Sequence, residues 1–223
     1  MQQTLAPLLG EARKSLLGAL RSLFHALKRE KLIFRDPTRG ISLTTARALP
    51  RPLTDDQLAG ALDRLPFIRD QLSLALAAVH ALSVHDQRGL RLDDLDRHRG
   101  RLTVRRTGGI EYVIYLDDLT QNLITRWSAE RHRRWPATTN PHLLVTAQTS
   151  ADDTHPRIHP HAINKPLGRI GLQAGRLRTD RILDEAKHTA DPVRLVQLSP
   201  TTAMRYVRAA HPTHFGRGLF IAP

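Results

Sequence analysis

The chain has 223 residues and a formal net charge of +13, with 34 Lys and Arg residues against 21 Asp and Glu residues. Hydrophobic residues make up 40% of it but aromatic residues only 4%, so we expect a buried core built mainly from aliphatic side chains. The absence of cysteine excludes disulfides and cysteine-ligated zinc, no apolar run approaches the roughly 18 residues of a membrane span, and the basic excess makes nucleic acid the first candidate partner.

The N-terminal region predicts a basic amphipathic helix over residues 11–33. Its apolar side chains recur at helical spacing, at Leu16, Leu20, Leu23, Phe24 and Leu27. Such a helix either covers a core or faces DNA, and both interpretations stay open. The turn residues from Asp36 to Gly40 end it. Residues 41–52 show no periodicity and predict an extended linker.

The next segment predicts the centre of the core. Thr54 and Gln57 form a capping-box pattern, so we expect a helix from Asp55 to about Arg64. Residues 68–82 are apolar nearly all round and predict a central helix, in which we expect His80 to be a packed side chain rather than a ligand. Residues 83–89 are expected to break this helix, and residues 90–96 to form a short turn of helix or a loop.

A β-hairpin is the clearest predicted element. Residues 101–106 alternate polar and apolar side chains, residues 107–109 form the turn, and residues 110–115 return. Asp117 and Asp118 then begin a helix that runs to about Arg134. Its expected buried side chains are Leu119, Leu123, Ile124 and Trp127. Residues 142–146 are predicted to form a third strand.

Residues 151–163 contain several side chains of the types that bind metal ions. They are Asp152, Asp153, His155, His159 and His161. Two prolines and a loop-like composition favour an exposed, unstructured cluster over a metal site. We therefore expect no metal and no cofactor. Residues 164–173 predict a weak basic helix, interrupted by Pro166.

The last third of the chain carries the candidate chemistry. Residues 175–208 predict two or three short basic helices, with helix starts at Asp191-Pro192 and Ser199-Pro200. The segment ends in Tyr206, which Arg205 and Arg208 flank. A phenol near arginines in a basic protein favours phosphodiester chemistry on nucleic acid. The alternative is a DNA-binding helix whose tyrosine only packs or touches a phosphate.

These elements predict a mainly α fold with a small antiparallel β-hairpin or sheet, an α+β class. Their order resembles that of the tyrosine recombinase (phage integrase) family, especially its actinobacterial members. The strings that carry the resemblance are LFHALKREKLIFRDPTRGI, RLTVRRTGGIEYVIYL and SPTTAMRY, together with the helices around His80. The resemblance implies a partial helical core-binding domain at 1–40, a linker at 41–52, an integrase-like catalytic domain at 53–211 and a tail at 212–223.

In that family a tyrosine attacks a DNA phosphodiester and forms a 3′-phosphotyrosine link without a metal or cofactor. Arginines, a lysine and histidine-type groups surround the phosphate. The resemblance assigns the nucleophile to Tyr206 and the second arginine to Arg178. Other family positions hold different residues in this chain: Ser83 for the first arginine, Gly175 for the motif histidine, Thr107 for the lysine, and Gln197 or Leu198 for the later His or Trp. Further candidate phosphate contacts are Arg88, Arg105, Arg106, Arg181 and Arg205.

The resemblance therefore predicts a double-stranded DNA partner, and it leaves strand cleavage open because several catalytic groups differ. Removing one preorganised donor costs roughly 10²–10³ in rate. Two alternatives are a non-catalytic DNA-binding remnant and a helix-turn-helix regulator built from residues 191–208. We also expect a cytoplasmic, nucleoid-associated protein that has no membrane partner and is a candidate homo-oligomer on DNA.

Overall fold

The computed structural model describes most of the chain. The described residues are 10–39, 53–106, 109–189, 191, 195, 198 and 200–211. The predicted linker at 41–52, the tail, Thr107 and Gln197 lie outside them. Backbone contacts divide the chain into two compact units, residues 1–49 and residues 50–223. No helix in the described part of the chain is long and apolar enough to cross a bilayer.

The described part of the first unit is one helix and a turn. Helix α2 spans Gly10–Arg29, as the apolar spacing predicts, and ends earlier than residue 33. The reason is local, because Lys31 adopts a left-handed backbone conformation with φ 59°. Asp36 then accepts hydrogen bonds from the backbone and the hydroxyl of Thr38, which closes the turn after the helix.

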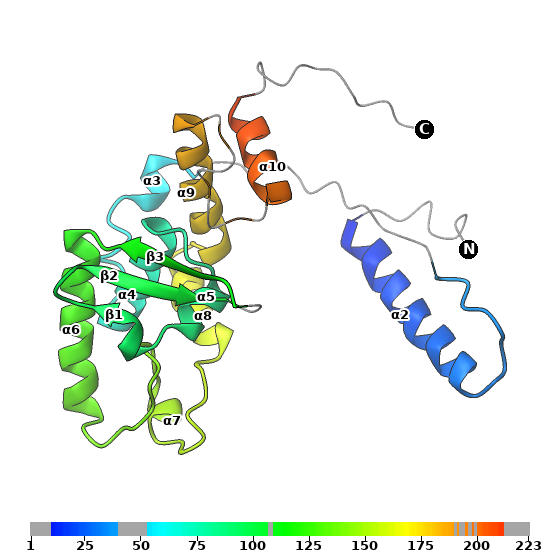
Figure 1. The fold of residues 1–223 in the computed structure, drawn as a ribbon, viewed down its shortest axis with the longest axis horizontal. Coiled ribbons are helices and arrows are strands. Elements are labelled where there is room, and N and C mark those ends of the chain that lie inside the picture. The colour runs from blue at the N-terminus through cyan, green and yellow to red at the C-terminus, as the bar shows by residue number, and fades with distance from the viewer. Residues whose placement is uncertain are drawn as a thin grey trace. The chain divides into compact units, whose positions relative to one another are not determined.

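The second unit is mainly helical and contains a three-stranded antiparallel sheet in the order β1-β2-β3 (Figure 1). Its strands are β1 (Leu95–Asp96), β2 (Arg101–Arg105) and β3 (Glu111–Tyr115). Its helices are α3 (Asp55–Leu58), α4 (Ile68–Ala78), α5 (Val84–Gly89), the 3₁₀ turn η1 (Leu92–Asp94), α6 (Asp118–Arg134), α7 (Ala147–Ser150), α8 (Pro160–Arg169), α9 (Ala174–His188) and α10 (Pro200–Ala210). This confirms the mainly helical composition with a small antiparallel sheet.

Helix α4 is the centre of the second unit, as its apolar sequence predicts. Helices α6, α8 and α9 all pack against it. Leu72, Leu76 and Ala77 on α4 are fully buried, and so are Leu102 and Val104 on the inner face of β2. Burying each of these Leu or Val side chains stabilises the fold by about 1.5–3 kcal/mol. We call the large buried cluster that contains them the main core.

A smaller buried cluster holds the C-terminal helix, and we call it the C-terminal cluster. It joins α9 and α10, which lie side by side in Figure 1, to the end of α4. Its buried members are Ala81, Ile182, Leu183, Ala186, Leu195, Ala203, Tyr206 and Val207. Helix α10 begins at Pro200, as the proline predicts. Of the segment after Asp191 the structure describes too little to test the other predicted helix start.

Several sequence predictions about elements are wrong. The helix expected at 164–173 is α8, which begins at Pro160, ends at Arg169 and continues through Pro166. Residues 84–89 are not a break but helix α5, which Ser83 and Asp86 begin with a reciprocal capping box. Residues 142–146 form no strand, because their backbone pairs only at the isolated bridge between His142 and Arg91 while Leu143 to Val145 fill the main core. The predicted helix from Asp55 ends at Leu58, and turns follow it.

One side-chain placement is also wrong. Leu119 is 42% exposed, whereas Leu123, Ile124 and Trp127 are buried as predicted. The buried stripe of α6 therefore begins with Thr120, whose hydroxyl lies 3.1 Å from His80 Nε2. His80 itself is a packed side chain, and its ring nitrogen also lies 3.0 Å from a carboxylate oxygen of Asp117.

Candidate functional site

The predicted first-arginine position, Ser83, lies at the start of α5 beside an ion pair. The Ser83 hydroxyl donates to Asp86 Oδ2 at 2.8 Å. The Arg106 guanidinium, which follows β2, holds the same carboxylate with two bonds: Nε to Oδ1 at 2.9 Å and Nη2 to Oδ2 at 2.8 Å. The hairpin thus places the Arg106 guanidinium on the same carboxylate that Ser83 contacts at the start of α5.

This ion pair is largely buried, since Asp86 is only 3% exposed. Burial alone would raise the pKa of Asp86, but the hydrogen bonds from Arg106 and Ser83 outweigh it and the pKa lies below its ordinary value. The bond to Asp86 likewise raises the pKa of Arg106. Both groups are therefore charged over the whole physiological pH range, and the position of Arg106 is fixed in two directions.

Tyr112 contacts the arginine of this ion pair. Arg106 Nη2 donates to the Tyr112 hydroxyl at 3.0 Å, and the Arg106 guanidinium carbon lies 4.8 Å from the centre of the Tyr112 ring. Burial and the nearby Asp86 carboxylate raise the pKa of Tyr112 to about 12, although the charges of Arg106 and Arg178 oppose this. Tyr112 therefore stays protonated, and its phenol carries a proton that it can donate to an anion.

Arg178, the predicted second arginine, lies on α9 within electrostatic range of Tyr112. Its Nε atom is buried and has no hydrogen-bond partner in the structure. A buried, unsatisfied donor of this kind costs about 1–3 kcal/mol, more when it is charged, so a ligand that accepts from it gains that energy. As a phosphate contact, Arg178 remains a prediction.

Tyr206, the predicted nucleophile, is 8% exposed and its ring belongs to the C-terminal cluster. Its hydroxyl nevertheless has a polar partner, because it donates to Thr179 Oγ1 at 3.3 Å. Thr179 follows Arg178 directly on α9, so the phenol of α10 is bonded to the residue beside the candidate phosphate-binding arginine. The motif-histidine position, Gly175, is exposed, and nothing lies within 4 Å of where its Cβ would be.

The other candidate arginines contact protein acceptors. Arg88 Nε donates to the carbonyl of Ile158. Arg105 forms ion pairs with Asp94 and, at 2.9 Å, with Glu111. These contacts tie α5 to the loop before α8 and β2 to its neighbours. Arg88 and Arg105 remain predictions as phosphate contacts.

Arg181 lies one turn further along α9 and holds the helix to α4. Its Nε donates to the Val79 carbonyl at 3.0 Å, and its terminal nitrogens pair with Asp184 at 2.8 Å and Glu185 at 3.1 Å. Arg205 lies half-buried on α10, one residue before Tyr206. As phosphate contacts, both also remain predictions.

Sequence reasoning missed Asp86, Tyr112 and Thr179. The serine and aspartate three residues apart at 83 and 86 are a capping pattern that signals a helix start. Tyr112 is the partner of Val104 in the hairpin register, which places it on the inner face of the sheet. No local pattern indicates Thr179, whose role depends on where α10 docks.

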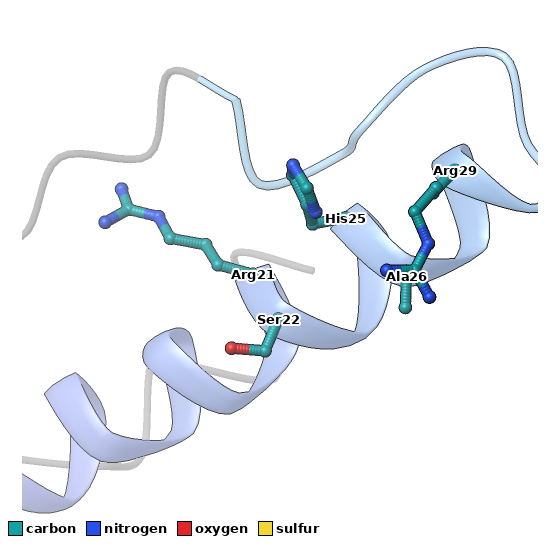
Figure 2. A pocket seen from close by; sticks show the side chains of 5 residues that line it. All are labelled: Arg21, Ser22, His25, Ala26 and Arg29. Atoms are coloured by element: carbon teal, nitrogen blue, oxygen red, sulfur yellow. The ribbon is translucent and has the colours of Figure 1, made fainter.

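The first unit carries a separate basic surface. Figure 2 shows a shallow hollow on α2, and the residues that line it are Arg21, Ser22, His25, Ala26 and Arg29. Two arginines and a histidine therefore share one face of this helix. The face suits contact with an anionic polymer, in line with the DNA-facing interpretation of α2.

Comparison with known proteins shows which sequences the chain resembles. No protein-family model matches the chain. It is 32% identical over 141 residues to tyrosine recombinase XerC of Pseudomonas fluorescens strain Pf0-1, which covers 59% of the chain and 46% of that protein. It is 31% identical over 174 residues to XerC of Pseudomonas syringae pv. syringae strain B728a, which covers 73% of the chain and 54% of that protein.

Solved structures share the fold. The crystal structure of XerH site-specific recombinase bound to a palindromic difH substrate matches with a TM-score of 0.65 at 17% identity, over 95% of the chain and 66% of that protein. The chain is a distant member of the tyrosine recombinase and integrase family. The chain spans about half the length of the XerC proteins that it matches.

Proposed function

We propose that this tyrosine recombinase homologue binds double-stranded DNA and that Arg178 holds one backbone phosphate. The observation that carries the proposal is the buried Nε of Arg178, a cationic donor without a protein acceptor in a chain of net charge +13. A phosphodiester supplies the missing acceptor together with a negative charge. The match to a recombinase structure bound to its DNA substrate supports the same partner.

The test compares two variants that remove the same charge. We expect Arg178→Gln to weaken binding to a duplex of about 30 base pairs roughly tenfold, because a hydrogen bond to a charged group contributes about 1.5–3 kcal/mol. Arg133→Gln is the matched control, since Figure 1 shows the end of α6 far from α9 and α10. Fluorescence anisotropy at fixed salt gives both affinities. Equal losses in the two variants would show that only total charge matters and would overturn the proposal.

Strand cleavage is the second candidate function, with Tyr206 as the nucleophile. The supporting observation is the bond from its hydroxyl to Thr179, beside Arg178. Attack by the phenolate oxygen on phosphorus would form the phosphotyrosine bond and release a 5′-hydroxyl, which must receive a proton. Ser83 and Gly175 supply neither the charge nor the proton that the family's residues supply there, so a slow reaction is expected.

A nicked duplex that traps the covalent intermediate tests this second function. If Tyr206 attacks DNA, wild-type protein yields an adduct on a denaturing gel that Tyr206→Phe does not. Tyr115→Phe is the control, because Tyr115 is 69% exposed on the outer face of the sheet. No adduct with wild-type protein, or the same adduct with Tyr206→Phe, would leave DNA binding without cleavage.

A further inference from the structure

We propose that Arg106, positioned by Asp86, supplies the guanidinium that is absent at Ser83, so that Arg106, Tyr112 and Arg178 form one binding site for a phosphodiester anion. The inference rests on the proposed function only for the identity of the ligand as a DNA backbone phosphate. The inference adds that Arg106, from the hairpin, takes the phosphate-binding role that the resemblance assigns to position 83 at the start of α5.

The first argument is position. Asp86 accepts from the Ser83 backbone, from the Ser83 hydroxyl and from Arg106, so one carboxylate gathers all three groups. An arginine at 83 would compete for this same carboxylate. Serine is short enough to cap α5 and leave room for the guanidinium of Arg106, which reaches Asp86 from the end of β2.

The second argument is the convergence of donors. Tyr112 is bonded to Arg106, and the charge of Arg178 on α9 acts on the same phenol. Because its hydroxyl oxygen accepts from Arg106, the phenolic proton points to another acceptor. Arg178 offers its Nε. Two cations and a phenol in one site would suit an anion with several oxygens, as a phosphodiester has.

The third argument is the balance of charge. Asp86 neutralises one of the two guanidinium groups, which leaves a net positive charge of one at the site. A phosphodiester carries a single negative charge and matches it. A phosphomonoester carries close to two negative charges, so its second charge would be unmatched and repelled by the Asp86 carboxylate. The site therefore favours an internal backbone phosphate over a terminal phosphate.

The experiment uses the full chain and dimethyl phosphate, a small phosphodiester, as the probe. The Nε–Hε signals of Arg106 and Arg178 are followed by NMR during the titration. We expect both signals to shift with one common saturation curve. Arg106→Gln should weaken the response of Arg178 at least fivefold, whereas Arg101→Gln, on the outer face of β2 over Tyr115, leaves it unchanged.

Arg106→Gln leaves the buried Asp86 carboxylate without its ion-pair partner, so this variant can fail to fold. Asp86→Asn combined with Arg106→Gln replaces the ion pair with two amides of similar size and serves as the second variant. Adding Ser83→Arg to Arg106→Gln returns a guanidinium to Asp86 from α5, and should restore the Arg178 response to within about twofold of wild type. A purely structural Arg106 would leave the Arg178 response to dimethyl phosphate unaltered in every folded variant.

The outcomes separate this inference from the proposed function. The inference is overturned if the Arg178 signal saturates equally in wild type and in a folded variant without a guanidinium at Asp86, either Arg106→Gln or Asp86→Asn with Arg106→Gln. It is also overturned if a protein that binds duplex DNA shows no saturable shift. A response to dimethyl phosphate that depends on Arg106, in a protein that does not bind duplex DNA, supports the inference and overturns the proposed function instead.

Discussion

At the scale of single residues, burial decides which polar groups are structural. His80 is buried against Asp117 and Thr120, and burial lowers its pKa although Asp117 opposes the change. His142 is also buried, and burial likewise lowers its pKa. Both imidazoles are therefore neutral in the folded protein at neutral pH, and both belong to the scaffold rather than to the phosphate site.

The two histidines make the fold sensitive to mild acid. Their folded pKa values lie below the unfolded value of about 6.5, so the unfolded chain takes up protons first as the pH falls. The free energy of unfolding should be constant above pH 7 and fall below pH 6.5, by at most about 1.4 kcal/mol per pH unit for each histidine. It levels off once the pH is below the folded pKa values. Urea unfolding at a series of pH values measures this.

A variant identifies the contribution of His80. Gln at this position keeps a donor for Asp117 and does not titrate, so His80→Gln should reduce the slope between pH 6.5 and 5.5 without removing it, because His142 still titrates. The exposed His132 on α6 provides the control, and His132→Gln should leave the slope as in wild type. An unchanged slope in His80→Gln would show that the buried His80 does not contribute.

At the scale of elements, local patterns predict the long and the regular parts of this fold. Alternation predicts the hairpin, helical spacing predicts α2 and α6, and a sequence that is apolar nearly all round predicts α4. Helix α5 has six residues, fewer than two turns, so its periodicity is too short to detect, and its capping box is the only local signal. The apolar run at 142–146 looks like a strand because periodicity alone does not separate a buried strand from a buried loop.

The candidate site is less predictable than the long elements, because part of it depends on residues that are far apart in the sequence. The resemblance predicts Arg178 and Tyr206 as neighbours, and the structure places the Tyr206 hydroxyl on the residue next to Arg178. Their catalytic roles remain predictions. The pairing of Asp86 with Arg106 spans 20 residues and two elements, so no local pattern contains it. Only the packing of the hairpin against α5 brings these two side chains together.

The turn between β1 and β2 should be intolerant of side chains. Gly100 has φ +59°, and a Cβ there would lie 2.7 Å from Gln121 Nε2, which donates to the Leu116 carbonyl. Gly100→Ala should therefore lower the free energy of unfolding by about 2–3 kcal/mol, from backbone strain and the lost contact of Gln121. Chemical denaturation measures the change.

Gly109 is the matched position for this test. It has a similar conformation, φ +74°, but nothing lies within 4 Å of its Cβ position. Gly109→Ala should cost only the backbone strain, about 1 kcal/mol. Equal losses in the two variants would mean that the contact with Gln121 does not contribute to the stability of the sheet.

At the scale of the whole molecule, net charge is the property that most affects the expected binding to DNA. The net charge of +13 arises mainly from arginine, which favours bidentate phosphate contacts. Basic side chains occur in both units, on α2 as well as around α9. Contact with several phosphates along a duplex is therefore expected, with the site around Arg178 as only one of them.

Binding to duplex DNA should consequently weaken steeply with salt. Each phosphate contact contributes about −0.9 to the slope of log K against log salt concentration, so five or more contacts predict a slope steeper than about −4. Anisotropy titrations between about 50 and 200 mM salt measure it. A duplex with an uncharged peptide backbone is the control and should not bind. A slope close to zero would contradict electrostatic binding to the backbone.

The separation of the main core from the C-terminal cluster has an evolutionary consequence. Tyr206 and α10 depend on the small cluster, whereas α4, α6 and the sheet depend on the large one. Replacements that loosen α10 therefore leave most of the scaffold intact. Selection can therefore preserve the main core while the sequence of α10 diverges.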